Sequence, residues 1–107
     1  MVNNQKICGL IGLATKAGKI VAGTDACLQE IEKRKINIIM LANNASERTK
    51  NHFKNKCKEA NIQIYEGLSM EELSSCTGKS NKAVLGIKDK GFMQAIIKII
   101  NGGEIIG

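Results

Sequence analysis

The residues most suggestive of chemistry lie between Gly12 and Ile20, where the sequence GLATKAGKI resembles a phosphate-binding loop. Such a loop has four residues between its glycines, a strand before it, a helix after it, and a Ser or Thr hydroxyl for magnesium. Here five residues separate Gly12 from Gly18, and Ile20 stands where the hydroxyl belongs. The nearby Gly9-Leu10-Ile11-Gly12 resembles an RNA-clamping G-x-x-G turn, but its centre is apolar, as on a buried helix face. We expect neither motif to bind a ligand.

Nucleophilic and metal chemistry lack the necessary partner residues. The only histidine, His52, lies among lysines, so we expect an exposed imidazole rather than a catalytic base. The adjacent pair Glu71-Glu72 fits a helix-capping box better than paired acid and base. The four cysteines show no C-x-x-C spacing, and we expect buried free thiols at Cys8, Cys27, Cys57 and Cys76. The sequence therefore predicts a protein that is not an enzyme and that uses no metal or organic cofactor.

The distribution of positive charge gives a stronger signal. Lys and Arg number 16 against 10 Asp and Glu, a formal net charge of +6. Many of the basic residues flank turns, namely Lys16, Lys19, Lys33, Arg34, Lys35, Lys79 and Lys82. Cations near helix C-termini also complement the helix macrodipole, so charge alone leaves an ordinary solvated surface open beside nucleic-acid binding.

Hydrophobic periodicity predicts helices and strands in alternation. Helical spacing of apolar residues favours helices over 4–16, from 23 or 24 to 34, and over 46–60, 69–76 and 89–100. Apolar or alternating segments favour strands over 36–42, 62–65 and 83–87, and a short stretch over 19–22 precedes the second helix. Such an order indicates an α-β-α sandwich around a parallel or mixed sheet of about four strands.

Length and composition indicate a single domain over residues 1–107. The chain contains no internal repeat, linker or proline, and 43% of its residues are hydrophobic. Its apolar runs are shorter than the roughly 20 residues that span a bilayer, and no signal peptide is recognisable. We therefore expect a cytoplasmic protein that makes no membrane contact.

The scarcity of aromatic residues narrows the class of nucleic acid. Phe53 and Phe92 fall on predicted core faces, which leaves only Tyr65, and stacking of single-stranded bases then fits poorly. Structured RNA, held through phosphates and polar base edges, fits better. Gly23-Thr24 at the start of the second predicted helix suits a phosphate or base acceptor, although an ordinary capped helix start explains this feature equally well.

Three segments together resemble a known family: KAGKIVAGT over 16–24, LANN over 41–44, and CTGK over 76–79 before a hydrophobic strand. In this order and spacing, the chain resembles the kink-turn-binding ribosomal proteins of the L7Ae/L30e type, and most closely their small bacterial YlxQ-like members. This resemblance implies a three-layer α-β-α sandwich with a mixed four-stranded sheet. It also implies that the protein recognises a kink-turn or a similar internal loop of structured RNA and stabilises its bent form. Ribosomal RNA is one candidate for this ligand.

By position, the resemblance assigns three groups of RNA-binding residues. The start of the second helix supplies Gly23, Thr24, Asp25 and Gln29, with Lys33 further along it. The end of the following strand supplies Asn43 and Asn44, and the loop before the last strand supplies Gly78, Lys79, Ser80, Asn81 and Lys82. Residue chemistry then suggests that backbone N–H groups of Gly23 and Thr24 meet RNA acceptors, Asn43 reads a base edge, and the lysines neutralise phosphates.

Three positions differ from the pattern typical of strong kink-turn binders. Asp25 replaces Asn or Lys, Ala26 replaces Glu or Gln, and Gln29 replaces Lys. The alternative function is therefore a protein-interaction module of the same fold with weak or generic RNA affinity. We expect a monomer that can associate with the ribosome.

Overall fold

A computed structural model provides the structure, which describes residues 2–102. Helices and strands alternate along the chain, as the periodicity predicts. The helices are α1 (Asn4–Lys16), α2 (Thr24–Glu32), α3 (Glu47–Ala60), α4 (Met70–Thr77) and α5 (Lys90–Ile100). The strands are β1 (Ile20–Ala22), β2 (Ile38–Leu41), β3 (Gln63–Tyr65) and β4 (Val84–Ile87). Predicted and observed boundaries differ by no more than two residues, and the two-residue differences lie at the end of α2 and the start of β2, where irregular backbone replaces regular structure.

The four strands form one mixed sheet in the order β1-β4-β2-β3. Strand β4 runs antiparallel to both of its neighbours, pairing Ala22 with Leu85 and Leu41 with Val84. Strand β3 runs parallel to β2. The C-terminal ends of β1 and β2 and the N-terminal end of β4 therefore meet at one edge of the sheet.

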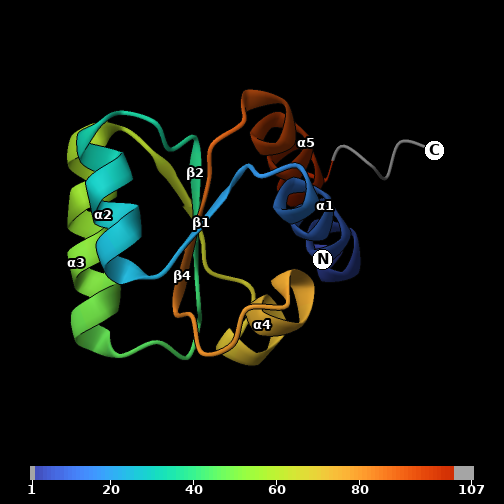
Figure 1. The fold of residues 1–107 in the computed structure, drawn as a ribbon, viewed down its shortest axis with the longest axis horizontal. Helices are drawn as coiled ribbons and strands as arrows, with labels where there is room; N and C mark the ends of the chain where they lie inside the picture. The colour runs from blue at the N-terminus through green and yellow to red at the C-terminus, as the bar shows by residue number, and fades with distance from the viewer. Residues whose placement is uncertain (1, 103–107) are drawn as a thin grey trace.

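Helices cover both faces of this sheet. Figure 1 shows α2 and α3 on one face and α1, α4 and α5 on the other. Strands β2 and β4 are buried along their whole length, because both of their faces lie under helices. The fold class implied by the resemblance, a three-layer sandwich with a mixed four-stranded sheet, is confirmed.

Side-chain caps fix where four of the described helices begin. Asn3, Ser46, Ser69 and Asp89 each accept a hydrogen bond from a first-turn backbone N–H group, of α1, α3, α4 and α5 respectively. Ser69 and Glu72 complete the capping box that the sequence predicts. Helix α2 differs, because its N-cap is Gly23 and no side chain caps it.

The prediction of four free thiols is wrong for two of the cysteines. Cys8 of α1 and Cys76 of α4 form a disulfide, with their Cα atoms 5.2 Å apart. The two helices approach closely because Gly12 has no side chain: a Cβ atom there would lie 3.3 Å from the Cys76 carbonyl oxygen. Sequence spacing alone did not reveal this approach, since 68 residues separate the two cysteines. Cys27 and Cys57 are buried free thiols, as predicted.

Candidate nucleic-acid interface

The edge of the sheet where β1 and β2 end and β4 begins carries most of the sequence-predicted residues. The backbone N–H of Gly23 donates to the Val84 carbonyl at 2.9 Å, and that of Ala42 donates to the Ala83 carbonyl at 2.8 Å. These bonds tie three chain segments together: the start of α2, the turn after β2 and the loop before β4. We call the solvent-accessible part of these segments the interface edge. It comprises Gly23–Asp25, Asn43 and residues 78–82, of which Gly23 and Lys82 are half-buried and the rest exposed. In Figure 1 this edge lies at the lower end of the sheet.

Gly23 is the residue that the interface edge requires to be glycine. Its φ of 101° and ψ of 156° belong to a region that only glycine occupies readily. The expectation that its N–H contacts RNA is wrong, because that N–H already donates to Val84. The open donors are the next ones, since α2 has no side-chain cap and the N–H groups of Thr24, Asp25 and Ala26 belong to its first turn.

The ammonium group of Lys82 lies beside this helix start. A Cβ atom at Gly23 would be 4.0 Å from the Lys82 Nζ. Within residues 2–102, no ion pair joins Lys82 to a carboxylate. A side-chain cation and the positive pole of α2 thus converge, and although the Asp25 carboxylate lies in the same first turn, no described ion pair joins it to Lys82. The uncapped N–H groups and the Lys82 ammonium group together suit an anion such as phosphate.

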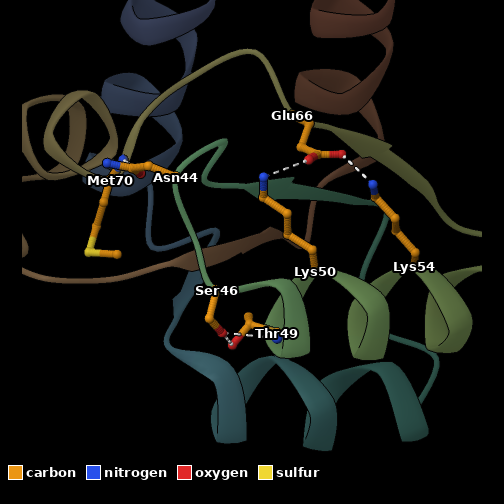
Figure 2. Close-up of polar contacts among 7 residues, drawn as sticks. All are labelled: Asn44, Ser46, Thr49, Lys50, Lys54, Glu66 and Met70. Carbon is orange, nitrogen blue, oxygen red and sulfur yellow. Dashed lines mark hydrogen bonds and ion pairs between the residues drawn. The ribbon is translucent and has the colours of Figure 1, made fainter.

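The two asparagines after β2 play different parts. The Asn44 side chain accepts a hydrogen bond from the Met70 N–H at 2.9 Å (Figure 2). It also donates to Glu71 at 3.0 Å, and the two bonds fasten the turn to the start of α4. Hydrogen bonds from its own backbone N–H and from Asn44 hold the pKa of Glu71 below its usual value. Asn43 is exposed, and its backbone N–H donates to the Leu68 carbonyl at 2.8 Å. Asn43 therefore offers its carboxamide to a ligand, whereas Asn44 is a structural brace.

The loop over residues 78–82 owes its shape to two left-handed residues. Gly78 ends α4 with φ 74°, and Asn81 has φ 56°, a conformation that Asn tolerates better than most residues. Between them, the Lys79 N–H donates to the Thr77 Oγ1 at 3.1 Å. Lys79, Ser80 and Asn81 are exposed, so this loop presents polar side chains beside Asn43 and the start of α2.

Two of the predicted residues, Gln29 and Lys33, lie further along α2, away from the interface edge. Asp25 and Gln29 are exposed and lie one helical turn apart, on the same face. Lys33 is the C-cap of α2, and its ammonium group lies 3.6 Å from Glu30. At 1.5 Å per residue, Lys33 lies roughly 15 Å along the helix axis from Gly23. The structure therefore does not bring Lys33 together with the other predicted residues.

Ion pairs engage three of the lysines on α3. Glu66, just after β3, contacts Lys50 at 3.6 Å and Lys54 at 3.1 Å (Figure 2). Lys56 contacts Glu32 of α2 at 4.0 Å. The same figure shows Ser46 and Thr49 joined at the start of α3. Much of the positive charge on α3 is thus balanced within the protein.

Neither aromatic stacking nor catalysis gains support from the described residues. Phe53 is buried, and the Tyr65 hydroxyl donates to the Asn4 side chain, so neither ring is free to stack on a base. His52 is exposed, as predicted. Burial raises the pKa of the Cys27 thiol to about 12 and that of Cys57 to about 11, which keeps both protonated and unreactive at neutral pH. Within residues 2–102, no cluster of metal-ligating side chains is present and no helix has both the length and the apolar character to cross a membrane.

Sequence reasoning missed two features of this site. The approach of Lys82 to Gly23 depends on the antiparallel pairing of β4 with β1, which local patterns do not encode. The Cys8–Cys76 disulfide anchors the end of α4 only two residues before Gly78. The one available signal was the even number of cysteines in the sequence.

Comparison with known proteins agrees with this architecture. Residues 5–97 match the ribosomal protein L7Ae/L30e/S12e/Gadd45 family. The chain is 38% identical over 100 residues to the RNA-binding protein YlxQ of Enterococcus faecium, covering 94% of this chain and 96% of the relative. It is 28% identical over 92 residues to the YlxQ protein of Bacillus subtilis (strain 168), covering 86% and 92% respectively.

Two solved structures share the fold. A Bacillus halodurans C protein of unknown function superposes with a TM-score of 0.86 at 25% identity, covering 90% of this chain and 97% of that one. A Giardia lamblia 15.5kD RNA binding protein superposes with a TM-score of 0.77 at 14% identity, covering 97% and 89%. Because the family match spans most of the described helices and all four strands, this chain belongs to the ribosomal protein L7Ae/L30e/S12e/Gadd45 family.

Proposed function

We propose that this protein is a non-enzymatic RNA-binding protein whose interface edge recognises a kink-turn or a similar structured internal loop. The observation that carries the proposal is the convergence of the uncapped start of α2 with the Lys82 ammonium group. The YlxQ relatives, which align over nearly the whole chain, are named as RNA-binding proteins and support the same class of ligand.

Each part of the interface edge suits a different part of a bent RNA. The first-turn N–H groups of α2 and the Lys82 ammonium suit a phosphate or an exposed base acceptor. The Asn43 carboxamide can both donate to and accept from a base edge. The Asp25 carboxylate can only accept hydrogen bonds, so it suits the N1 and N2 donors of a guanine base. A sharp bend in the RNA exposes such base edges.

Binding of this kind stabilises the bent RNA by selection. An internal loop exchanges between extended and bent forms, and a protein that contacts only the bent form raises its population. The proposed binding unit is a cytoplasmic monomer, and a ribosomal RNA segment is a suitable ligand. Neither a cofactor nor a bond-making step is involved.

The test is a titration of the protein against a kink-turn RNA, a matched duplex and a single strand at two salt concentrations. The proposal predicts preferential binding of the kink-turn, with log affinity falling by roughly 0.7 to 0.9 per phosphate contact for each tenfold rise in salt. Equal, weak binding of all three RNAs would contradict it and favour a protein partner instead.

Variants locate the contact. Asn43→Ala removes an exposed carboxamide and Lys82→Ala a half-buried lysine, neither of which holds another described element in place. Each variant is expected to weaken kink-turn binding by about tenfold. Lys54→Ala is the matched control, because it removes a lysine that already pairs with Glu66. A loss with Lys54→Ala as large as that with Lys82→Ala would refute the assignment of the site.

A further inference from the structure

A second group of basic residues lies at the opposite edge of the sheet from the interface edge. There β1 and β2 begin and β4 ends, with both Ile20 and Ile38 paired to Ile87. The turns leaving this edge hold a set that we call the distal basic surface, comprising Lys19, Lys33, Arg34, Lys35, Lys88 and Lys90. All are exposed except Lys88, which is half-buried.

Backbone and side-chain contacts join these turns. The Lys88 N–H donates to the Lys19 carbonyl at 2.9 Å, and the Lys35 N–H donates to the Glu30 carbonyl at 2.9 Å. The Glu30 carboxylate contacts the Lys88 ammonium at 2.9 Å and that of Lys33 at 3.6 Å. One carboxylate therefore serves several cations, and its pKa is lowered, first by the Lys88 hydrogen bond and further by the charges of Lys88, Lys33 and Lys35.

The other cations of this surface lack acidic partners. Within residues 2–102, no ion pair involves Lys19, Arg34, Lys35 or Lys90. The neighbouring Asp89 carboxylate accepts from the Phe92 N–H at 2.8 Å and caps α5. Positive charge thus remains in excess here, at a cost in self-repulsion.

Helix dipoles do not account for this excess. A cation near the C-terminus of a helix is favourable, which explains Lys33 at the end of α2. Lys90, however, is the first residue of α5, where the same dipole disfavours a cation. Lys19 and Lys88 lie outside any helix. Protein partners are often anchored by large, exposed apolar side chains. Among the described residues, the large apolar side chain that is exposed is that of Leu13, and it lines a groove between α1 and α4, away from the distal basic surface.

We infer that the distal basic surface binds the phosphate backbone of an RNA helix, so that the two ends of the sheet contact two separate RNA segments. Ammonium and guanidinium groups without nearby aromatic rings suit phosphates rather than bases. The two-segment arrangement rests on the proposed function of the interface edge; the contact with duplex RNA does not.

The experiment measures binding of a plain RNA duplex as a function of salt. Lys19→Glu/Lys35→Glu, which leaves the Glu30 ion pairs intact, is expected to weaken duplex binding about tenfold and to lower the salt slope by roughly one per lost phosphate contact. The single variants Lys35→Glu and Lys98→Glu change the net charge equally, and Lys98 lies in the last turn of α5, away from this surface. Equal losses in these two singles would show a net-charge effect and overturn the inference.

Two further arms separate the possible failures. The variant Asn43→Ala/Lys82→Ala is expected to lose preference for the kink-turn while keeping its duplex affinity. If wild-type protein shows no such preference, the proposed function fails, yet the duplex arm still tests the distal basic surface. Polyglutamate of matched charge serves as the competitor. If the protein binds this peptide more tightly than the duplex, and Lys19→Glu/Lys35→Glu removes that binding, the surface belongs to an acidic protein partner and the RNA assignment is refuted.

Discussion

The two edges of the sheet present positive charge in different ways. At the interface edge, a single ammonium group, that of Lys82, adjoins an uncapped helix start, while Glu66 binds Lys50 and Lys54 nearby. At the distal edge, the Glu30 carboxylate pairs with both Lys33 and Lys88, while the neighbouring cations Lys19, Arg34, Lys35 and Lys90 have no described ion pair. The interface edge thus presents few charges in a fixed geometry, whereas the distal edge presents many charges.

The two edges therefore meet different requirements: selecting one RNA shape over another, and attracting RNA of any shape. Fixed N–H groups, a carboxamide and a glycine in a restricted conformation can distinguish one RNA shape from another. A field of exposed lysines attracts any polyanion and loses strength with salt. We therefore expect substitutions at the interface edge to change which RNA is bound, and those at the distal edge to change how salt affects binding.

The largest expected effect concerns the disulfide that holds the interface loop. Loss of the Cys8–Cys76 bond by Cys8→Ser/Cys76→Ser should lower the free energy of unfolding by up to about 4 kcal/mol, because 68 residues separate the two cysteines. Urea denaturation measures this loss, and amide hydrogen exchange should show added mobility in residues 78–82 but not in 33–37. Uniform added exchange at both edges would contradict a local role.

Substitution of two glycines with positive φ, Gly23 and Gly18, compares the backbone strain at the two edges. Gly23→Asn should cost about 1 to 3 kcal/mol of stability, since its φ and ψ suit only glycine. Gly18→Asn, in the turn leading to the distal edge, should cost much less, because φ 71° with open space around the Cα suits a left-handed Asn. Thermal denaturation of both variants tests this, and equal losses would contradict the difference. Because Gly23 variants are strained, they cannot by themselves report on RNA contact.

The neighbouring asparagines separate bracing from binding within one edge. Asn44→Ala should cost about 1 kcal/mol of stability, because the Met70 N–H at the start of α4 loses its acceptor. Asn43→Ala should change stability by less than about 0.5 kcal/mol while weakening RNA binding. Chemical denaturation and a kink-turn titration on both variants measure the two effects. Should both variants behave alike in both assays, the division of roles is wrong.

The smallest expected effect concerns Glu30 at the distal edge. Its pKa is lowered in the folded protein, so its ionised form stabilises the fold above its ordinary pKa, and this contribution is lost as the pH falls through the lowered value. Glu30→Gln should therefore be less stable than wild type at pH 7 and indistinguishable from it in strong acid. The same variant frees Lys33 and Lys88, so its duplex affinity should rise about twofold at low salt. Unchanged affinity would indicate that these lysines do not contact phosphate.

Much of the architecture could be predicted because local rules determine it. The caps at Ser46, Ser69 and Asp89 and the apolar β2 and β4 segments set the element boundaries. Alternation of helices and strands then indicated the layered fold, and the resemblance supplied the mixed sheet. The three segments that the resemblance names lie together at the interface edge, whereas Gln29 and Lys33 lie further along α2 and the Asn44 side chain braces α4.

The remaining details depend on contacts between distant segments. The Cys8–Cys76 disulfide, the bond from Gly23 to Val84 and the brace from Asn44 to Met70 all join residues at least 26 positions apart. No periodicity or motif specifies such a pair. The same holds for the distal basic surface: the sequence predicts Lys19 and Lys33–Lys35 at separate turns, and the strand register brings them together with Lys88 and Lys90.

Amide chemical-shift mapping of the protein with a kink-turn RNA tests the central claim most directly. The interface edge should respond, with the largest shifts at the amides of Thr24, Asp25 and Ala26, the Asn43 side chain and residues 78–82. A matched RNA whose internal loop is replaced by Watson–Crick pairs should produce much smaller shifts there. Shifts confined to residues 33–35 and 88–90, or equal for both RNAs, would contradict recognition by the interface edge.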